Sequence, residues 1–159
     1  MAILSLIKTP DEFLRKKSKK VEEFDARLGL LLDDMSETLK KAHDGIGLAA
    51  VQVGFLKRLF IVDYGGEYIE FINPEILEHS ENKLNYEACL SVTGREGYVK
   101  RPRKVTVKWQ DRFGEFHERQ FKGYISYVIG HEFDHIEGVL FIDKLVEKPK
   151  KNVTEAEAE

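Results

Sequence analysis

Apolar residues recur with helical spacing in one long stretch of the first third of the chain. Residues three or four apart share one face of a helix, so the stretch predicts an amphipathic helix that begins near Asp25, a residue suited to the N-cap. Gly45 is expected to end this helix, and a short helical turn is predicted before it, near residues 11–17. The apolar face comprises Leu28, Leu31, Leu32, Met35, Leu39 and Ala42.

A second helical stripe lies near the carboxyl end, over about residues 123–137. An apolar stripe normally points toward the interior or toward a pocket. The two histidines on this stripe are therefore predicted to face inward, where buried imidazoles need partners. The stripe consists of Tyr124, Tyr127, Val128, His131 and His135.

Strand-like segments separate the two predicted helices and come in pairs around turn residues. Paired strands of this kind form hairpins. Hairpins between helices favour an α+β fold with antiparallel sheets over alternating parallel units. Residues 87–92 are also expected to be extended chain that can pair with a peptide backbone. The hairpin strands are expected at 58–64 and 68–73, around Gly65 and Gly66, and at 104–109 and 115–121, around a turn at 111–114.

The composition fits one domain with a hydrophobic core, since 42% of the 159 residues are apolar and 33% are charged. We expect a single catalytic domain over residues 1–147 and a charged, solvated tail over 148–159. The net charge of -3 argues against nucleic acid as a direct partner. No long apolar span or signal-peptide pattern is present, so neither membrane insertion nor secretion is expected.

The most informative stretch is His131-Glu132-Phe133-Asp134-His135. Histidines four apart on a helix can bind one metal ion, while Glu132 stands close enough to handle a proton of a water molecule. The alternative interpretation is a polar helix face without a ligand. The apolar stripe that carries both histidines favours the metal site, and the pattern predicts metal-assisted hydrolysis.

Few residues can supply a third ligand. The third-histidine position of the long metalloprotease motif holds Phe141, and only Glu147 and the tail glutamates follow, in a lysine-rich stretch without room for a packed helix. Cys89, the only cysteine, is the remaining soft ligand. A lone cysteine is otherwise a small buried hydrophobe. A thiolate with two imidazoles, however, leaves a fourth position open to water, as a catalytic ion needs. A single cysteine also fits a reducing cytoplasm.

A third motif lies at residues 45–52, where Gly45, Gly47 and two alanines allow a close approach of the backbone and Gln52 offers an amide donor. The segment lacks the glycine pattern of dinucleotide sites and the Lys-Ser/Thr of a phosphate loop, so nucleotide binding is unsupported. The plainer alternative is a helix stop followed by a tight turn.

Taken together, the three stretches resemble peptide deformylases, whose motifs read G-x-G-L-A-A-x-Q, E-G-C-L-S and H-E-x-x-H in this order. Here they stand at residues 45–52, 87–91 and 131–135. The similarity continues through residues 7–15, Arg101-Pro102 and residues 138–145, so it covers nearly all of the chain except the tail.

The resemblance implies a peptide-deformylase-like fold, with antiparallel sheets around a central C-terminal metal-binding helix. It implies that Cys89, His131 and His135 bind one divalent ion, Fe²⁺ in the cell, with Zn²⁺, Ni²⁺ or Co²⁺ able to occupy preparations. Glu132 would act as general acid and base. Gln52 and the backbone N–H of Leu90 would stabilise the oxyanion during removal of the formyl group from formyl-methionyl nascent peptides.

The resemblance also implies where the substrate binds. Gly45, Gly47 and Ala88 would lie along the peptide backbone, and Arg101 would either dock a peptide carbonyl or pair with a local acid. The methionine pocket would be lined by Ile46, Tyr124, Tyr127 and Val128, bulkier than the usual aliphatic lining unless one tyrosine ring points into the core. We expect a cytoplasmic monomer, and contact of the tail with the ribosome is left open.

Three positions depart from the family pattern: Ala88 replaces a glycine, Thr93 a proline and Gly130 a glutamine. Ala88 would cost roughly 1–2 kcal/mol at positive φ but little in extended chain, which is the case we expect. Two alternatives remain at this point. One is a catalytically silent module that binds metal or formyl-peptide, and the other is a metal-dependent endopeptidase.

Overall fold

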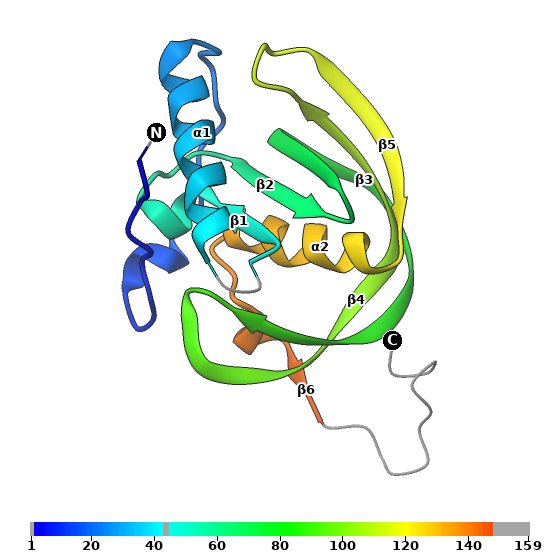
Figure 1. Ribbon diagram of the computed structural model, residues 1–159. Coiled ribbons are helices and arrows are strands. Elements are labelled where there is room, and N and C mark those ends of the chain that lie inside the picture. Colours follow the sequence, from blue (N-terminus) through cyan, green and yellow to red (C-terminus); the bar gives the residue numbers. More distant parts are fainter. Residues whose placement is uncertain (1, 43–44, 148–159) are drawn as a thin grey trace.

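The computed structural model describes residues 2–42 and 45–147 (Figure 1). Its elements follow one another as η1 (Glu12–Arg15), α1 (Ala26–Lys41), β1 (Gly47–Ala49), η2 (Ala50–Val53), β2 (Leu59–Tyr64), β3 (Glu67–Cys89), β4 (Val92–Gln110), β5 (Phe116–Lys122), α2 (Tyr124–Ile136), η3 (Phe141–Asp143) and β6 (Leu145–Val146).

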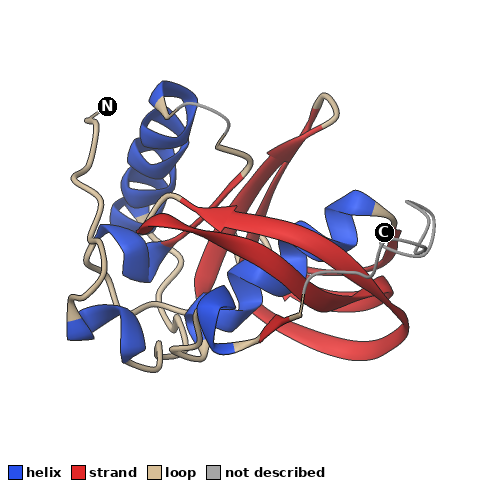
Figure 2. Ribbon diagram, turned by 90° about the horizontal axis from the view of Figure 1, so that it is seen from below, coloured by secondary structure: helices blue, strands red, loops and turns tan. Residues whose placement is uncertain are grey.

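The strands form one antiparallel sheet with the order β1-β2-β3-β4-β5, and β6 pairs with β4. Figure 1 shows α2 in the middle of the molecule with the sheet curving round it. In the view turned by 90°, strands pass on both sides of α2 while α1 stands at one end (Figure 2). The expected α+β fold, with antiparallel strands around a central helix near the carboxyl end, is confirmed.

The first long helix begins as predicted but ends earlier. Asp25 is its N-cap, and the carboxylate of Asp25 accepts a hydrogen bond from the Leu28 amide at 3.1 Å. The helix stops at Lys41, because Ala42 already has an extended conformation with ψ of 132°. Gly45 therefore does not end it. A Cβ at Gly45 would lie 2.8 Å from the Leu39 side chain, so the glycine lets the chain return past the last turn of α1.

The strands β3 and β4, of 23 and 19 residues, are much longer than the predicted ones. The expected hairpin strands at 68–73 and 104–109 cover only the beginning of β3 and the end of β4. The extended chain expected over residues 87–92 is found up to Cys89 and again at Val92, but the chain turns at residues 90–91 between them. Residues 77–82 are all exposed, so this part of β3 shows no alternation of apolar and polar side chains. Register shifts between Ile72 and Glu75, and again between Ile76 and Glu78, interrupt the pairing. Bulges of this kind bend a strand, as the curved sheet requires.

The core fills the space on both sides of β2. On one side α1 packs through Leu32 and Met35, which are fully buried. On the other side a chain of aromatic rings, with Phe60 on Phe71 at 4.9 Å and Phe71 on Trp109 at 4.8 Å between ring centres, packs toward α2. This packing places α2 against the sheet. In the part of the chain that the structure describes, no helix is both long and apolar enough to cross a membrane.

Candidate metal centre and substrate cavity

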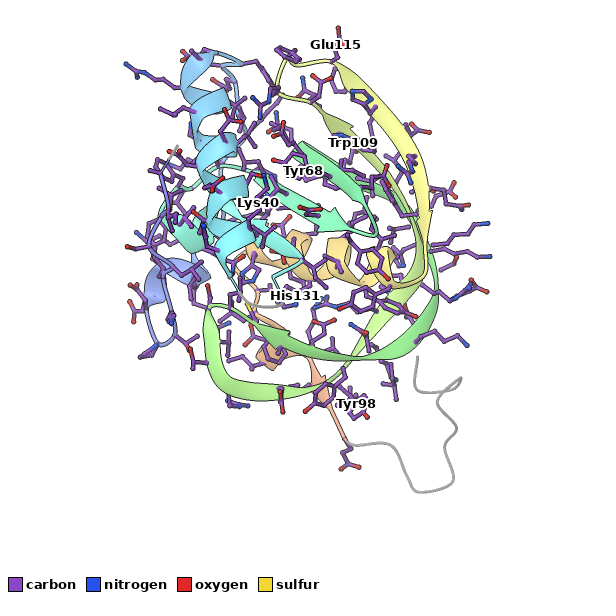
Figure 3. All side chains as sticks on the ribbon, in the orientation of Figure 1. Lys40, Tyr68, Tyr98, Trp109, Glu115 and His131 are labelled. Atoms are coloured by element: carbon purple, nitrogen blue, oxygen red, sulfur yellow. The ribbon has the colours of Figure 1, made fainter. Side chains whose placement is uncertain are left out.

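The structure brings the three predicted metal ligands together. Cys89 is the last residue of β3, and His131 and His135 lie one turn apart on α2. One ligand atom from each residue lies within 4.8 Å of the other two, and Cys89 Sγ is 3.4 Å from His135 Nε2. Figure 3 shows His131 between α2 and the long strands. A thiolate and two imidazoles at this spacing fit one divalent ion, with a further coordination position left for water.

His131 is oriented by a carboxylate. Its Nδ1 donates a hydrogen bond to Glu87 Oε1 at 2.8 Å, which leaves Nε2 to face the ion. Burial lowers the pKa of His131, but hydrogen bonds with Cys89 and Glu87 outweigh burial and raise the pKa to about 10. Surroundings that favour a proton on this ring also favour a bound cation, because both carry positive charge.

His135 has a different environment. It is 1% exposed, and its Nδ1 has no hydrogen-bond partner among the described residues. Burial and the neighbouring positive charges of His131 and Arg101 hold the pKa of His135 well below its usual range. The ring therefore stays neutral, as a metal ligand must be.

Glu132 is a buried carboxyl group beside the ligands. It is 4% exposed, and its Oε1 has no hydrogen-bond partner in the described part of the chain. Burial raises the pKa of Glu132 to about 7, with Glu87 and Asp134 adding to the effect and His131 and Arg101 opposing it. A carboxyl group with a pKa near neutrality can both take and return a proton at physiological pH.

Gln52 is held with its amide nitrogen toward the site. Its Oε1 accepts a hydrogen bond from the Ala49 amide at 2.9 Å, and its Nε2 donates to Ser91 Oγ at 3.0 Å. The same nitrogen lies 3.8 Å from Cys89 Sγ. Because both ends of the amide are fixed, Gln52 presents a donor beside the ligands without reorganisation.

Arg101 is the one predicted site residue that the structure places elsewhere. It is 2% exposed and does not line the cavity. Its Nε and Nη2 donate to the two oxygens of Glu87 at 2.8 and 3.0 Å, and its Nη1 donates to Asp134 at 2.6 Å. The expected contact of Arg101 with substrate is therefore wrong, and the alternative of pairing with local acids is correct, because a buried guanidinium needs anionic partners.

The Arg101 side chain lies beside Gly130, one of the departures from the family pattern. A Cβ at Gly130 would lie 3.3 Å from Arg101 Cδ, a tight contact that a shift of the arginine stem by a few tenths of an ångström would relieve. Asp134 is shared with Lys144, whose Nζ lies 3.1 Å away. Glu87 keeps its charge: burial raises its pKa, but His131 and Arg101 outweigh burial and lower the pKa to about 2.

A cavity of about 310 Å³ opens beside the ligands. All predicted site residues except Arg101 and His135 line this cavity. They are Cys89, His131 and Glu132, together with Gly45, Ile46, Gly47, Gln52, Ala88, Leu90, Tyr124, Tyr127 and Val128.

Among the non-glycine residues described, only Asn73 and Glu81 have positive φ. Ala88 therefore does not adopt the left-handed conformation, and it lies at the end of β3. An extended conformation is what the sequence predicted for Ala88.

Asn85, Tyr86 and Glu87 line the same cavity and were not predicted as site residues. Glu87 had a signal, since it stands at the first position of the motif that contains Cys89. Asn85 donates a hydrogen bond to Glu87 at 3.0 Å, and Tyr86 is 51% exposed. Nothing in the local sequence marks these two, because their place follows from the pairing of β3 with β4.

Known proteins share both the sequence and the fold. The family model described as "Polypeptide deformylase" matches residues 3–151. A peptide deformylase of Caldicellulosiruptor bescii is 49% identical over 146 residues, which cover 92% of this chain and 87% of that protein. Peptide deformylase 1 of Clostridium acetobutylicum is 50% identical over 147 residues, covering 92% and 97%.

Solved structures give the same result. The crystal structure of peptide deformylase from Thermotoga maritima superposes with a TM-score of 0.89 at 38% identity, covering 92% of this chain and all of that one. A peptide deformylase from Synechococcus elongatus in complex with actinonin superposes with a TM-score of 0.87 at 36% identity, covering 91% and 80%.

Proposed function

Because the chain belongs to the polypeptide deformylase family, we propose that the cavity beside Cys89, His131 and His135 is where its reaction takes place. The protein is a metal-dependent hydrolase that removes the formyl group from the N-terminal methionine of newly made polypeptides. The alternatives of a silent binding module and an endopeptidase find no support among its relatives.

Three side chains would hold the metal ion: Cys89, His131 and His135, whose ligand atoms lie within 4.8 Å of one another. A divalent ion bound there supplies Lewis-acid chemistry, by lowering the pKa of water and polarising the formyl carbonyl. Glu87 holds the His131 ring by its Nδ1 proton. The orientation of this ligand is therefore set before the ion binds.

Glu132 would move the proton. Its unpartnered Oε1 takes a proton from the attacking water, whose oxygen forms a bond to the formyl carbon. The bond from that carbon to the methionine nitrogen then breaks, and Glu132 gives its proton to this nitrogen. The products are formate and a free amino terminus, and Glu132 ends in the form in which it began.

Gln52 and the backbone N–H of Leu90 would stabilise negative charge on the formyl oxygen. Both residues line the cavity, and the Gln52 amide is held in place by Ala49 and Ser91. A donor of this kind typically contributes about 3 kcal/mol to stabilising the transition state. Gly45, Gly47 and Ala88 would lie along the peptide backbone, with Ile46, Tyr124, Tyr127 and Val128 against the methionine side chain.

We propose Fe²⁺ as the ion used in the cell. Affinity alone favours zinc over ferrous iron at a site with one thiolate and two imidazoles, so selection of iron would depend on availability. A thiolate-ligated ferrous site is open to oxygen. Aerobic preparations of the iron form should therefore lose activity faster than nickel-substituted ones, and equal lifetimes of the two forms would count against iron.

We further propose a cytoplasmic monomer with one catalytic domain over residues 1–147. The cytoplasm is where new polypeptides are made and where a thiolate ligand stays reduced. Light scattering would test the monomer. The tail of residues 148–159 lies outside the described residues, and its proposed contact with the ribosome would be tested by co-sedimentation with and without these residues.

The observation that carries the proposed site is the buried Glu132, whose Oε1 has no hydrogen-bond partner among the described residues, beside three convergent ligand atoms. A formyl-methionyl tripeptide that also contains an internal peptide bond tests it. We expect formate release with the internal bond intact. Internal cleavage would indicate an endopeptidase, and tight binding without release would indicate a silent module.

A further inference from the structure

The wall of the cavity on α2 is aromatic in this chain. Tyr124 and Tyr127 line the cavity, and we call these two rings the aromatic wall. They precede His131 by seven and four residues, so helical periodicity places all three side chains on one face of α2. Tyr127 is 5% exposed and Tyr124 is 42% exposed, so Tyr127 lies deeper and Tyr124 nearer the opening.

The two rings pack against each other. The centres of Tyr124 and Tyr127 are 6.4 Å apart with an interplanar angle of 86°, an edge-to-face arrangement. Tyr64, at the end of β2, packs on the outer side of Tyr124 with ring centres 5.1 Å apart. Tyr64 does not line the cavity. The aromatic wall is therefore a preformed surface and does not depend on a ligand to order it.

The length of the substrate brings its sulfur to this surface. With the formyl carbon at the proposed metal centre, five bonds separate it from the methionine sulfur, a reach of about 6 Å in extended form. A rise of about 1.5 Å per residue puts Tyr127 about 6 Å along the α2 axis from His131. Sulfur contacts aromatic rings favourably at about 5 Å, often at the ring edge. The methionine side chain is therefore long enough to place its thioether at the depth of Tyr127.

We propose that the aromatic wall recognises the thioether sulfur of the substrate methionine and makes this enzyme select methionine over an all-carbon side chain of the same length. The inference rests on the proposed placement of the formyl group at Cys89, His131 and His135. An aliphatic pocket would not make this distinction. It would favour the all-carbon side chain slightly, because a methylene group is more hydrophobic than a thioether sulfur.

The test compares two peptides that differ only in the sulfur, formyl-Met-Ala-Ser and formyl-norleucyl-Ala-Ser. The measured quantity is the ratio of their kcat/KM values for formate release. The wild-type enzyme should prefer the methionine peptide by about 2- to 10-fold, the range expected for a sulfur–aromatic contact. A wild-type ratio of one or below would overturn the proposal before any variant is made.

Variants then assign the preference to the rings. Tyr127→Leu should bring the ratio to one or below, and Tyr124→Leu, a change at a half-exposed position, should lower it from the wild-type value. Tyr127→Phe should retain the wild-type ratio because the ring remains. A Phe variant that falls as far as the Leu variant would contradict the proposal, since the hydroxyl group would then carry the preference. A wild-type ratio in either Leu variant would contradict it as well.

Tyr64→Leu is the matched control, because it removes a ring that packs on Tyr124 outside the cavity. Its ratio should equal that of the wild type, and a loss as large as in Tyr127→Leu would contradict the proposal. Each ratio is taken on one preparation, so the fraction of folded enzyme cancels. Failure of the inference is distinguishable from failure of the proposed function. Formate release without a methionine preference would contradict only the inference about the aromatic wall. No formate release from either peptide would contradict the proposed function as well.

Discussion

At the scale of single residues, the position of Glu132 depends on the absence of one methyl group. A Cβ at Gly47 would lie 2.8 Å from Glu132 Oε2 and 2.9 Å from its Cγ, closer than such contacts allow. Gly47→Ala should displace the carboxylate and lower kcat about 100-fold, the loss that a misplacement of about 1 Å can cause. The bound ion should remain, because no ligand is changed.

Steady-state kinetics and metal analysis on the same preparation measure both effects. Gly29→Ala is the matched control, since a Cβ on this helix meets only the Arg112 side chain at an ordinary 3.5 Å. Full activity in Gly47→Ala would show that Glu132 is not held where the structure places it.

Arg101 is the residue whose removal should harm the fold most directly. Arg101→Met leaves the buried carboxylates of Glu87 and Asp134 without their shared cation, which should cost about 3–5 kcal/mol of unfolding free energy. Denaturant unfolding measures this loss. Arg119→Met removes an exposed pair with Glu67 and should cost only about 0–1 kcal/mol. Equal losses in the two variants would mean that the buried network is not a major source of stability.

The sequence predicted the chemistry of the metal centre better than its surroundings. Cys89, His131 and His135 could be chosen because their types and spacing have few other uses. The role of Arg101 could not be predicted, because the local sequence does not distinguish an exposed arginine from a buried one. The burial of Arg101 follows only from the packing of β4 against α2. Tyr86 was missed for the same reason.

At the scale of elements, the segment after α2 depends on Gly138. This residue has φ of 74°, and a Cβ there would collide with the Arg15 carbonyl. Gly138→Ala should therefore destabilise the protein by more than the roughly 1–2 kcal/mol that left-handed backbone alone costs. Thermal unfolding measures the difference against Gly65→Ala, a turn glycine with φ of 63° and no atom near the added Cβ. A smaller loss at Gly138 than at Gly65 would contradict the packing described.

The helices were predicted more closely than the strands. The second helix was expected over residues 123–137 and spans Tyr124–Ile136, with Gly123 as N-cap and Glu137 as C-cap. Helical periodicity is a local signal and is strong when one face is buried. The local sequence of β3 and β4 does not show strand periodicity, because residues 77–82 are all exposed and each strand contains a proline, Pro74 or Pro102. These strands form because β3 and β4 pair with each other.

At the scale of the whole molecule, the metal centre exists only when the sheet and α2 are assembled. Cys89 and His131 come from β3 and α2 and meet through the folded core. Ion binding should therefore stabilise the fold, by about 2.7 kcal/mol when the ion is present at 100 times its dissociation constant. Removal of the ion with a chelator should lower the unfolding temperature of the wild type and leave that of Cys89→Ala unchanged. An equal decrease in both would show that the ion binds elsewhere.

The most direct test of the central claim measures bound ion and formate release on the same samples of wild type, Cys89→Ala and Glu132→Ala. The wild type should hold one ion and release formate from a formyl-methionyl peptide. Cys89→Ala should lose ion and activity together, whereas Glu132→Ala should keep the ion and release no formate. Turnover retained in either variant would contradict the account.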